Sequence, residues 1–515
     1  MKFIMKRRDF SDLVIPLKLE FSIERYSWST SGGPKQATIT AVGDRSALYE
    51  LVNHMRDPVE IINDRGDCVW WGYIASLVIS WKAIGYGVDI ETMYNRIAVA
   101  YTDQNIRYTT GWSGDAESIS EYGQKEILLS RSDTTESDSL QLRDTSLARM
   151  KYPSPTLQFA GDNGSAKITC LGWLQTLDWM YYANDAGKES YEATGQGGRE
   201  IGEDDRPILA QSFQISAASA WDASSIWLRV WKAGSSDPTD NLVVSLMSDN
   251  AGEPGTVLAS GSVAAAAIGA SSEWIEFELD SVVTLAIATT YWIKAARSGS
   301  VALTNYFMVD TNNIAGYALG ELKLYNTNLS AWTVETKWGD LLFKVVGGLE
   351  TTEQMETLVD ACGQFFWGTI IENASGIESN PFRDGDSRGL YELEKLLNAG
   401  SSNSRRLLCE VSRSLYLRVY EEPTKPAIGR NSHGVNQNGE LLTQFLAPVE
   451  PSLCTVGIWC HLQDVIPVSV DLSIVADPSL FLIEEAEYDA GSGKYNIIRT
   501  RDQANDMDIG GVVQG

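Results

Sequence analysis

Short runs of alternating apolar and polar residues recur along the N-terminal part of the chain. This alternation is typical of half-buried strands, and it predicts strands at Leu17–Ile23, Ala37–Ala41, Val69–Ile79 and Ile97–Tyr101. Between the second and third of these runs, the apolar spacing becomes that of one helical face. The residues of this face follow Asp44, a candidate N-cap, and are Leu48, Leu51, Val52 and Met55. We therefore expect a small β-barrel with one helix over residues 1–105.

The segment that follows is less regular. Residues 106–155 are polar and are expected to connect two domains, with short elements at Ile119–Leu129 and Leu140–Met150. A strand pair is expected after Thr156, around the turn Gly161–Gly164. These patterns indicate that a second domain begins near Thr156.

A helical spacing and then a linker follow the expected strand pair. Leu174, Leu177 and Tyr181 lie at helical spacing. The stretch Asn184–Asp205 is rich in glycine and acidic residues, which is typical of a linker. Residues 156–206 are thus predicted to form the first part of a second domain together with its linker.

The composition changes at about Pro207, after which Trp, Ser, Ala and Thr dominate and the helical period almost vanishes. Strand-like runs now recur at the spacing of an all-β sandwich. They are Ala210–Ile215, Ser225–Trp231, Leu242–Met247, Trp274–Leu279, Thr290–Ala295, Tyr306–Val309 and Leu341–Val346. The pattern predicts an independent sandwich over residues 207–347, inserted into the second domain.

Helical spacing returns after the sandwich. Met355, Leu358 and Val359 share one helical face, and a second helix is expected from Arg388 to Asn398, where Gly400 can end it. Two strands are expected to close the domain, Arg406–Glu410 and Leu415–Tyr420. Residues 348–424 would therefore be the second part of the split domain.

Residues 425–515 form a C-terminal extension to which the sequence assigns no role. Its strand candidates are Cys454–His461 and Val468–Val475. The predicted fold class is α+β and β-rich, with two β-barrel domains that carry short helices and an inserted all-β sandwich.

Charge and length narrow the classes of function. The 515 residues carry a formal net charge of −27, which opposes nonspecific binding to nucleic acids or anionic membranes because phosphates are bound by clustered Lys and Arg. No apolar window approaches the length of a membrane span, and the start Met1–Arg8 lacks the apolar stretch of a signal peptide. We expect a soluble protein that is made in a cytoplasm.

The cysteines and histidines give no sign of a metal centre. The six cysteines lie far apart in a chain that is long enough to fold without disulfides, so we expect free and mostly buried thiols. Cys454 and Cys460 lack the spacing of a zinc knuckle, and only three histidines occur, His54, His433 and His461. The sequence predicts no metal site and no cofactor.

The common catalytic motifs are missing from the sequence. It contains no Gly-x-Ser-x-Gly, P-loop, His-Glu-x-x-His or Gly-x-Gly-x-x-Gly pattern. Two acidic groups could supply the paired carboxylates of glycoside hydrolysis, namely Asp384 with Asp386, or Glu203, Asp204 and Asp205. Both groups lie beside glycine or in a polar linker, which favours solvated acids. We therefore predict no catalytic residues and a protein that is not an enzyme.

Two further motifs have a simpler structural interpretation. Arg65-Gly66-Asp67 could be a cell-adhesion motif, but its place between two apolar runs favours a hairpin turn. Asp240, Asp249 and Asn250 could supply oxygen ligands to calcium, but they lack EF-hand spacing, and a structural turn is favoured.

The order of turns and core aromatics outside the predicted sandwich resembles that of bacteriophage tail-hub proteins. The segments that carry the resemblance are Gly32–Pro34, Arg56–Ile61, Val69–Ile74, Met93–Tyr101, Asp115–Ile119, Glu121–Gly123, Cys170–Trp173 and Leu177–Trp179. The resemblance implies hub-type barrels in a homo-oligomer, typically a trimer whose paired barrels form a pseudo-sixfold ring. It also implies contacts with a tube or distal tail protein and with tip or fibre proteins. The chain would lie at the tail tip of the virion, and DNA would contact it only while it passes through. An acidic wall would repel a genome that slides through such a ring.

The inserted sandwich resembles a jelly-roll module that is common in phage and bacterial surface proteins. The segments in question are Ala210–Phe213, Ser248–Gly255, Leu258–Ser260 and Thr289–Ile293. Such modules are similar to carbohydrate-binding domains, which implies a host-surface glycan as a ligand to test. Four aromatic residues next to turns are the candidates for stacking against a sugar: Trp221, Tyr306, Tyr325 and Trp332.

The expected function is that of a structural subunit of a phage tail tip. Two alternatives remain open at this point: a distal tail protein that forms a sixfold ring and carries an inserted sugar-binding module, and a glycan hydrolase with an accessory sandwich. A hexamer would favour the former, and hydrolysis of a polysaccharide would favour the latter.

Overall fold

The computed structural model describes residues 1–13, 18–103, 106–159, 164–193, 195, 197–202, 208–312, 314, 316–327, 329–337, 339–423, 452, 456–457, 459–461 and 480–502. The chain forms two compact units. The first comprises Met1–Tyr182, Met355–Gly376 and Ser387–Gly515, and the second comprises Ala183–Gln354 and Ile377–Asp386. Strands predominate over short helices in both units, which confirms the predicted β-rich α+β class.

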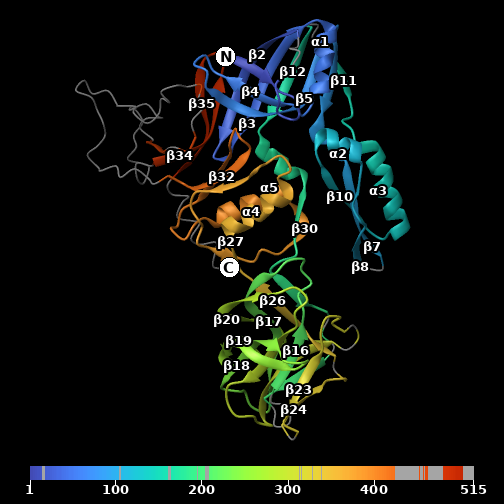
Figure 1. Ribbon diagram of the computed structural model, residues 1–515, viewed down its shortest axis with the longest axis vertical. Helices are drawn as coiled ribbons and strands as arrows, with labels where there is room; N and C mark the ends of the chain where they lie inside the picture. The colour runs from blue at the N-terminus through green and yellow to red at the C-terminus, as the bar shows by residue number, and fades with distance from the viewer. Residues whose placement is uncertain are drawn as a thin grey trace, which may run out of the picture. The chain divides into compact units, whose positions relative to one another are not determined.

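One large curved sheet organises the first unit (Figure 1). Its strands lie in the order β1 (Lys2–Met5), β4 (Pro58–Ile62), β5 (Cys68–Trp81), β12 (Ser165–Leu171), β3 (Ser31–Gly43), β2 (Leu19–Ser29), β34 (Leu480–Asp489) and β33 (Trp459–His461). Buried and exposed residues alternate in the first part of β2, whereas β3 and β5 contain runs of three or four consecutive buried residues. The core beneath them includes the fully buried rings of Tyr26, Trp70 and Tyr73.

Further strands extend this sheet at both ends. β6 (Ile84–Asp89) pairs with β5, and β11 (Thr156–Phe159) pairs with β6. β31 (Leu407–Val411) pairs with β3 and with β32 (Tyr416–Glu421), β28 (Gly368–Ile371) pairs with β32, and β35 (Lys494–Asp502) pairs with β34. The expected extension 425–515 thus contributes β33, β34 and β35 to the main sheet, while its other candidate, Val468–Val475, lies outside the described residues.

The expected strand pair around Gly161–Gly164 is wrong. β11 pairs instead with β6, and β12 lies between β3 and β5. The alternation in β12 buries Ala166, Ile168 and Cys170 in the core, so this strand is stabilised in the centre of the sheet and not at a hairpin. The segment that the sequence places at the start of a second domain therefore completes the sheet of the first.

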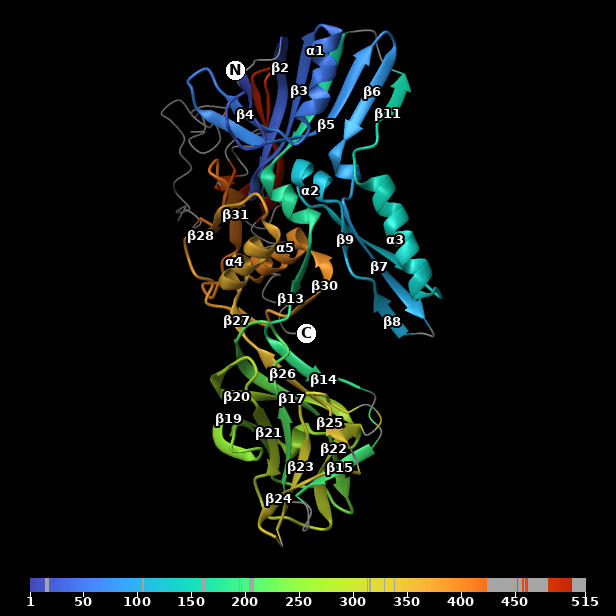
Figure 2. The ribbon, with the colours of Figure 1, turned by 45° about the vertical axis from the view of Figure 1, so that its right-hand side comes forward.

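A smaller sheet of β7 (Arg96–Asp103), β8 (Ile106–Thr109), β9 (Ser113–Gly114) and β10 (Glu126–Arg131) lies beside two helices, α2 (Ala116–Tyr122) and α3 (Glu136–Met150) (Figure 2). The sequence predicted only short elements in this segment. The long helix α3 begins after Thr135, whose Oγ1 accepts a hydrogen bond from the Asp138 amide at 3.2 Å. Of the residues in α3 only Ser139 is buried, so the helix has almost no apolar side whose spacing could predict its length.

The remaining helical elements cover the core of the first unit. They are α1 (Arg45–Glu50), η1 (Leu51–His54), η2 (Ile90–Thr92), η3 (Trp173–Trp179), α4 (Thr351–Cys362) and α5 (Gly389–Ala399). Met355, Leu358 and Val359 of α4 are buried in the core, and Gly400 ends α5 with a positive φ of 73°, both as predicted. Within the described part of the chain, no helix combines the length and apolar character needed to cross a bilayer.

The second unit is a two-sheet sandwich. The sheet that we call the β17 sheet has the order β14 (Lys188–Tyr191), β26 (Phe343–Gly347), β17 (Trp221–Gly234), β22 (Asn305–Asn312) and β15 (Gly197–Ile201), with β20 (Glu273–Leu285) beside β17 and β25 (Asp340–Leu341) beside β22. The sheet that we call the β16 sheet has the order β19 (Pro254–Ala264), β18 (Asn241–Asp249), β21 (Tyr291–Arg297), β16 (Ile208–Phe213), β23 (Leu322–Asn326) and β24 (Ala331–Val334). A short helical turn, η4 (Ala265–Ala267), follows β19. Buried apolar side chains from both sheets form one core.

The predicted linker 184–205 is wrong in its central part, since it contains β14 and β15. Both strands are short and polar, and they are held by pairing with β26 and β22, which lie far away in the sequence. Two short strand pairs complete the fold, β13 (Tyr181–Asn184) with β30 (Arg383–Arg388) and β27 (Leu349–Glu350) with β29 (Glu378–Ser379).

Candidate functional site

The outer face of the β16 sheet carries the candidate ligand-binding surface. In β21, Tyr291, Ile293 and Ala295 point into the sandwich core. Successive side chains of a strand alternate between its two faces, so Trp292 and Lys294 lie on the outer face. Ala210 of β16 is paired in register with Lys294 and with Lys323 of β23, so both Ala210 and Lys323 also lie on this face.

Trp292 is the centre of this face and is fixed by polar contacts. Its side chain is 1% exposed, and its Nε1 donates a hydrogen bond to Asp249 Oδ1 at 2.8 Å. The ammonium of Lys323 lies 5.4 Å from the centroid of the indole ring and donates a hydrogen bond to the Gly252 carbonyl. The Lys323 side chain thus covers the indole ring, and its ammonium is fixed by the ring and by the Gly252 carbonyl.

Tyr325 and Trp332 lie side by side at one end of the outer face. They are directly paired across β23 and β24, their ring centroids are 5.4 Å apart and their planes meet at 71°. Both are partly exposed, and Trp332 also packs against the buried group of Ala210, Met247 and Trp292. An aromatic pair of this kind offers an apolar surface next to polar groups.

The other two predicted sugar contacts do not join this pair. Trp221 is 6% exposed and belongs to the sandwich core, so the expectation that it presents a flat face outward is wrong. Its Nε1 has no hydrogen-bond partner among the described residues. Tyr306 is partly exposed but lies in β22 of the β17 sheet, opposite Ala233.

The acidic residues of the sandwich that could have bound calcium have structural partners. Asp240 binds Arg297 and accepts a hydrogen bond from the Gly299 amide. Asp249 accepts from Trp292 and from the Gly252 amide, and Asn250 and Glu253 exchange backbone hydrogen bonds. The favoured turn is thus confirmed, and the described residues contain no group of three or more side chains able to hold a metal ion.

The tripeptide Arg65–Asp67 forms a turn between β4 and β5, as expected. Asn63 Oδ1 accepts hydrogen bonds from the amides of Arg65 and Asp67, at 3.0 and 2.8 Å, and Gly66 has a φ of 92°. The turn closes the hairpin of β4 and β5.

Of the two proposed acidic groups, the structure describes one. Asp384 and Asp386 lie exposed on β30, where Asp384 Oδ1 accepts from the Asp386 amide at 3.0 Å. Glu203, Asp204 and Asp205 lie outside the described residues. His54, one of the few histidines, contacts Asp57 through its Nδ1 at 2.7 Å.

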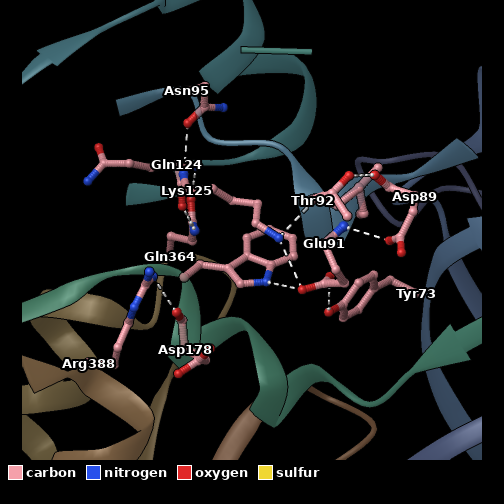
Figure 3. Close-up of polar contacts among 12 residues, drawn as sticks. Tyr73, Asp89, Glu91, Thr92, Asn95, Gln124, Lys125, Asp178, Gln364 and Arg388 are labelled. Atoms are coloured by element: carbon pink, nitrogen blue, oxygen red, sulfur yellow. Dashed lines mark hydrogen bonds and ion pairs between the residues drawn. The ribbon is translucent and has the colours of Figure 1, made fainter. Parts of the chain in front are cut away.

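A polar cluster in the first unit was missed by sequence reasoning (Figure 3). The Lys125 ammonium is buried and donates to Glu91 Oε2 and to the Ile90 carbonyl, both at 3.0 Å. The Trp179 Nε1 donates to the same Glu91 oxygen at 3.3 Å, and the Tyr73 hydroxyl donates to Glu91 Oε1 at 3.1 Å. We call these four residues, Tyr73, Glu91, Lys125 and Trp179, the Glu91 cluster.

Two aspartates lie next to the Glu91 cluster. The Asp89 carboxylate accepts a hydrogen bond from the Glu91 amide. The backbone carbonyl of Asp178 accepts one from the Arg388 guanidinium at 2.7 Å. Burial raises the pKa of both Asp89 and Asp178, and burial also lowers the pKa of Lys125. The cluster joins β5, η2, the start of β10 and η3, so its hydrogen bonds fix the smaller sheet on the large one. No signal in the sequence marks it, because its members are far apart in the chain.

The described cysteines behave as core residues. Cys170, Cys362 and Cys409 are buried and Cys68 is partly buried, and all four are free thiols. Burial raises the pKa of Cys68 to about 11 and those of Cys362 and Cys409 to about 12. Thiols with such pKa values are poor nucleophiles.

No protein-family model matches the sequence, and a search of curated proteins returns no match. Solved structures give weak similarities. A clostridial cysteine protease after propeptide cleavage is 10% identical over 63% of this chain and 70% of its own, with a TM-score of 0.22. A glycoside hydrolase family 43 arabinoxylan arabinofuranohydrolase from Bacillus subtilis, in complex with cellotetraose, is 12% identical over 53% of this chain and 63% of its own, with a TM-score of 0.16. The subviral particle protein VP2 of infectious bursal disease virus is 10% identical over 63% of this chain and 78% of its own, with a TM-score of 0.13. Similarities of this size carry no conclusion about fold or function.

Proposed function

We propose that this chain is a structural subunit of a bacteriophage tail tip, of the tail-hub or baseplate type. In this role it assembles with copies of itself, as a trimer, and joins the tail tube to the tip proteins while the genome passes through the ring. Its sandwich projects a surface for glycans of the host.

The observation that carries the proposal is the packing of the segments that resemble tail-hub proteins. Three of these segments meet where β3, β5 and β12 run side by side. A Cβ atom at Gly172 would lie 1.7 Å from the Pro34 carbonyl oxygen, and one at Gly72 would lie 2.1 Å from that of Leu171. Glycine is therefore required at both positions, so the three segments pack against one another in this fold, and this packing supports the proposal.

An exposed apolar edge supports the oligomeric part of the proposal. Leu157 and Phe159 of β11 are 77% and 99% exposed, and Ile84, opposite Phe159 on β6, is 53% exposed. Among the described strands β11 pairs only with β6, so within the described part of the chain its other edge has no partner strand. The occupant that we infer is another edge of a second copy of this chain. A closed ring of three copies needs such a heterologous contact, and the uncharged β11 adds no repulsion between two acidic chains.

The glycan part of the proposal rests on the outer face of the β16 sheet. There Tyr325 and Trp332 form a partly exposed aromatic pair beside Lys323, whose ammonium is fixed by the Gly252 carbonyl. Fixed aromatic and polar groups on one rigid sheet bind a sugar with little loss of side-chain entropy.

The test of the assembly is native mass spectrometry of the full chain, followed by electron microscopy of particles that contain it. A trimer at micromolar concentration and density at the tail tip are expected. A monomer at all concentrations, or density elsewhere on the particle, overturns the proposal. A hexamer would instead favour the distal tail protein.

The hydrolase alternative has its own test. Purified chain is incubated with host polysaccharide, and the release of reducing ends is measured. We expect none. Release that disappears in Asp384→Asn or Asp386→Asn chains would replace the structural proposal by a hydrolase with an accessory sandwich.

A further inference from the structure

Two lysines lie on either side of one alanine on the outer face of the sandwich. Ala210 in β16 is paired in register with Lys294 of β21 and with Lys323 of β23. Directly paired residues point to the same face of a sheet, so both lysine side chains start on the outer face, on strands about 10 Å apart. The side chain of Lys323 then lies along this face, over the Trp292 ring. Ala210 is small and buried, so no large side chain separates the two lysines in this row.

The two lysines differ in how their charges are balanced. Lys323 contacts Glu321 at 3.1 Å and the Gly252 carbonyl, and Glu321 itself is 45% exposed. Lys294 makes no ion pair among the described residues. We call the row of Lys294, Ala210 and Lys323 the lysine strip. Glu321 balances the charge of Lys323 there, so the charge of Lys294 is the one that remains for a ligand.

The aromatic pair lies next to this strip. Tyr325 is two residues after Lys323 in β23 and therefore lies on the same face. Trp332 is paired with Tyr325, and Val334 is paired with Lys323. A ligand that stacks on Tyr325 and Trp332 would thus bring its substituents to the lysines.

We infer that this outer face binds a glycan whose sugars carry carboxylate groups, with the rings on Tyr325 and Trp332 and the carboxylates on Lys294 and Lys323. This inference rests on the glycan-binding role proposed above and narrows it to one class of glycan. A neutral sugar would leave the charge of Lys294 without a partner, whereas a uronate supplies one.

The experiment uses the full chain and an array of matched oligosaccharide pairs. Each pair consists of a neutral chain of glucose, galactose or mannose and the same chain with its C6 carbons oxidised to carboxylates. We expect the chain to bind the acidic member of at least one pair about tenfold more tightly. Added salt should weaken this binding and leave any neutral binding unchanged.

Three variants test whether positive charge on this face strengthens the binding of the acidic member. Lys294→Gln should weaken binding of the acidic member about fivefold, and Glu321→Gln should strengthen it, since removal of a competing carboxylate frees Lys323. Lys232→Gln, in β17 of the opposite sheet, is the matched control and should change nothing. A structural role of Lys294 alone would not predict opposite effects of Lys294→Gln and Glu321→Gln.

The outcomes separate this inference from the proposed function. Equal binding of neutral and acidic members, or equal effects of the three variants, overturns the inference and leaves the glycan role standing. Binding of no member by a chain that still forms its trimer in native mass spectrometry overturns both the inference and the glycan role, and leaves the structural role standing.

Discussion

The ammonium of Lys125 lies 4.4 Å from the centroid of the Trp179 indole, and both residues donate a hydrogen bond to the same oxygen of Glu91. A buried ammonium is stable only where an opposite charge balances it and its N–H groups find hydrogen-bond acceptors. Here Glu91, the Ile90 carbonyl and the indole ring match them. The arrangement makes Lys125 a link between the two sheets of the first unit.

Replacement of Lys125 by alanine should therefore be costly. We expect Lys125→Ala to lower the free energy of unfolding by about 3–5 kcal/mol, because Glu91 and Ile90 lose a buried partner. Urea denaturation followed by tryptophan fluorescence measures the change. Lys35→Ala is the matched control. Its ion pair with Glu485 lies at the surface, with Lys35 54% exposed, so a loss below about 1 kcal/mol is expected. Equal losses in the two variants would contradict the linking role.

A second prediction concerns the close contact of β3 with the residue that follows β12. Gly172→Ala should destabilise the first unit by about 2–3 kcal/mol or prevent its folding, because the new Cβ would meet the Pro34 carbonyl oxygen at 1.7 Å. Thermal unfolding measures this loss. Gly111→Ala is the control, since a Cβ there meets no atom within 4 Å. A Gly172→Ala chain as stable as the Gly111→Ala chain would show that the strands can separate at no cost.

The strands of the sandwich could be predicted because their signal is local. In β17, β18 and β21 every second residue enters the core, and each strand is long enough to show this alternation. β14 and β15 could not be predicted in this way. They are four and five residues long, and pairing with the distant strands β26 and β22 decides their conformation.

The candidate site was predictable only in part. Tyr325 and Trp332 were recognisable as aromatics near turns, but their contact depends on the register of β23 and β24. The approach of Lys294 to Lys323 depends on β16 lying between two strands that are far apart in sequence. In the sequence, Trp221 and Trp332 both stand next to turn residues. They differ in the structure, because Trp221 is buried in the sandwich core and Trp332 is only partly buried on the outer face.

The apolar edge of β11 should be a contact between copies of the chain. We expect the double replacement of Leu157 and Phe159 by serine to shift the oligomer toward monomer by at least tenfold in dissociation constant, because the contact loses buried apolar surface. Analytical ultracentrifugation measures the shift.

The control for this experiment removes apolar surface elsewhere. Val282→Ser with Ile287→Ser changes two side chains of the second unit that are 55% and 52% exposed. This pair should leave the oligomer unchanged, and an equal shift in both double variants would argue against a contact at β11.

The stability of the sandwich should depend on Glu192 at low pH. Burial alone would raise the pKa of Glu192, but hydrogen bonds from Lys188 and Lys344 outweigh it and lower the pKa to about 2. The two Lys–Glu distances are 2.7 and 2.8 Å. The pKa in the folded state thus lies below the ordinary value of 4.5. The carboxylate therefore contributes stability that is fully present above about pH 4.5 and is lost as the pH falls toward 2.

Glu192→Gln should reproduce this loss at neutral pH. Because Glu192 is 35% exposed and screened by water, we expect only about 1 kcal/mol at pH 7, and the difference from the unsubstituted chain should shrink between pH 4.5 and 2. Unfolding of the sandwich at a series of pH values measures this convergence. A difference that stays constant down to pH 2 would mean that the two lysines do not stabilise the ionised carboxylate, and that Glu192 acts only through its packing.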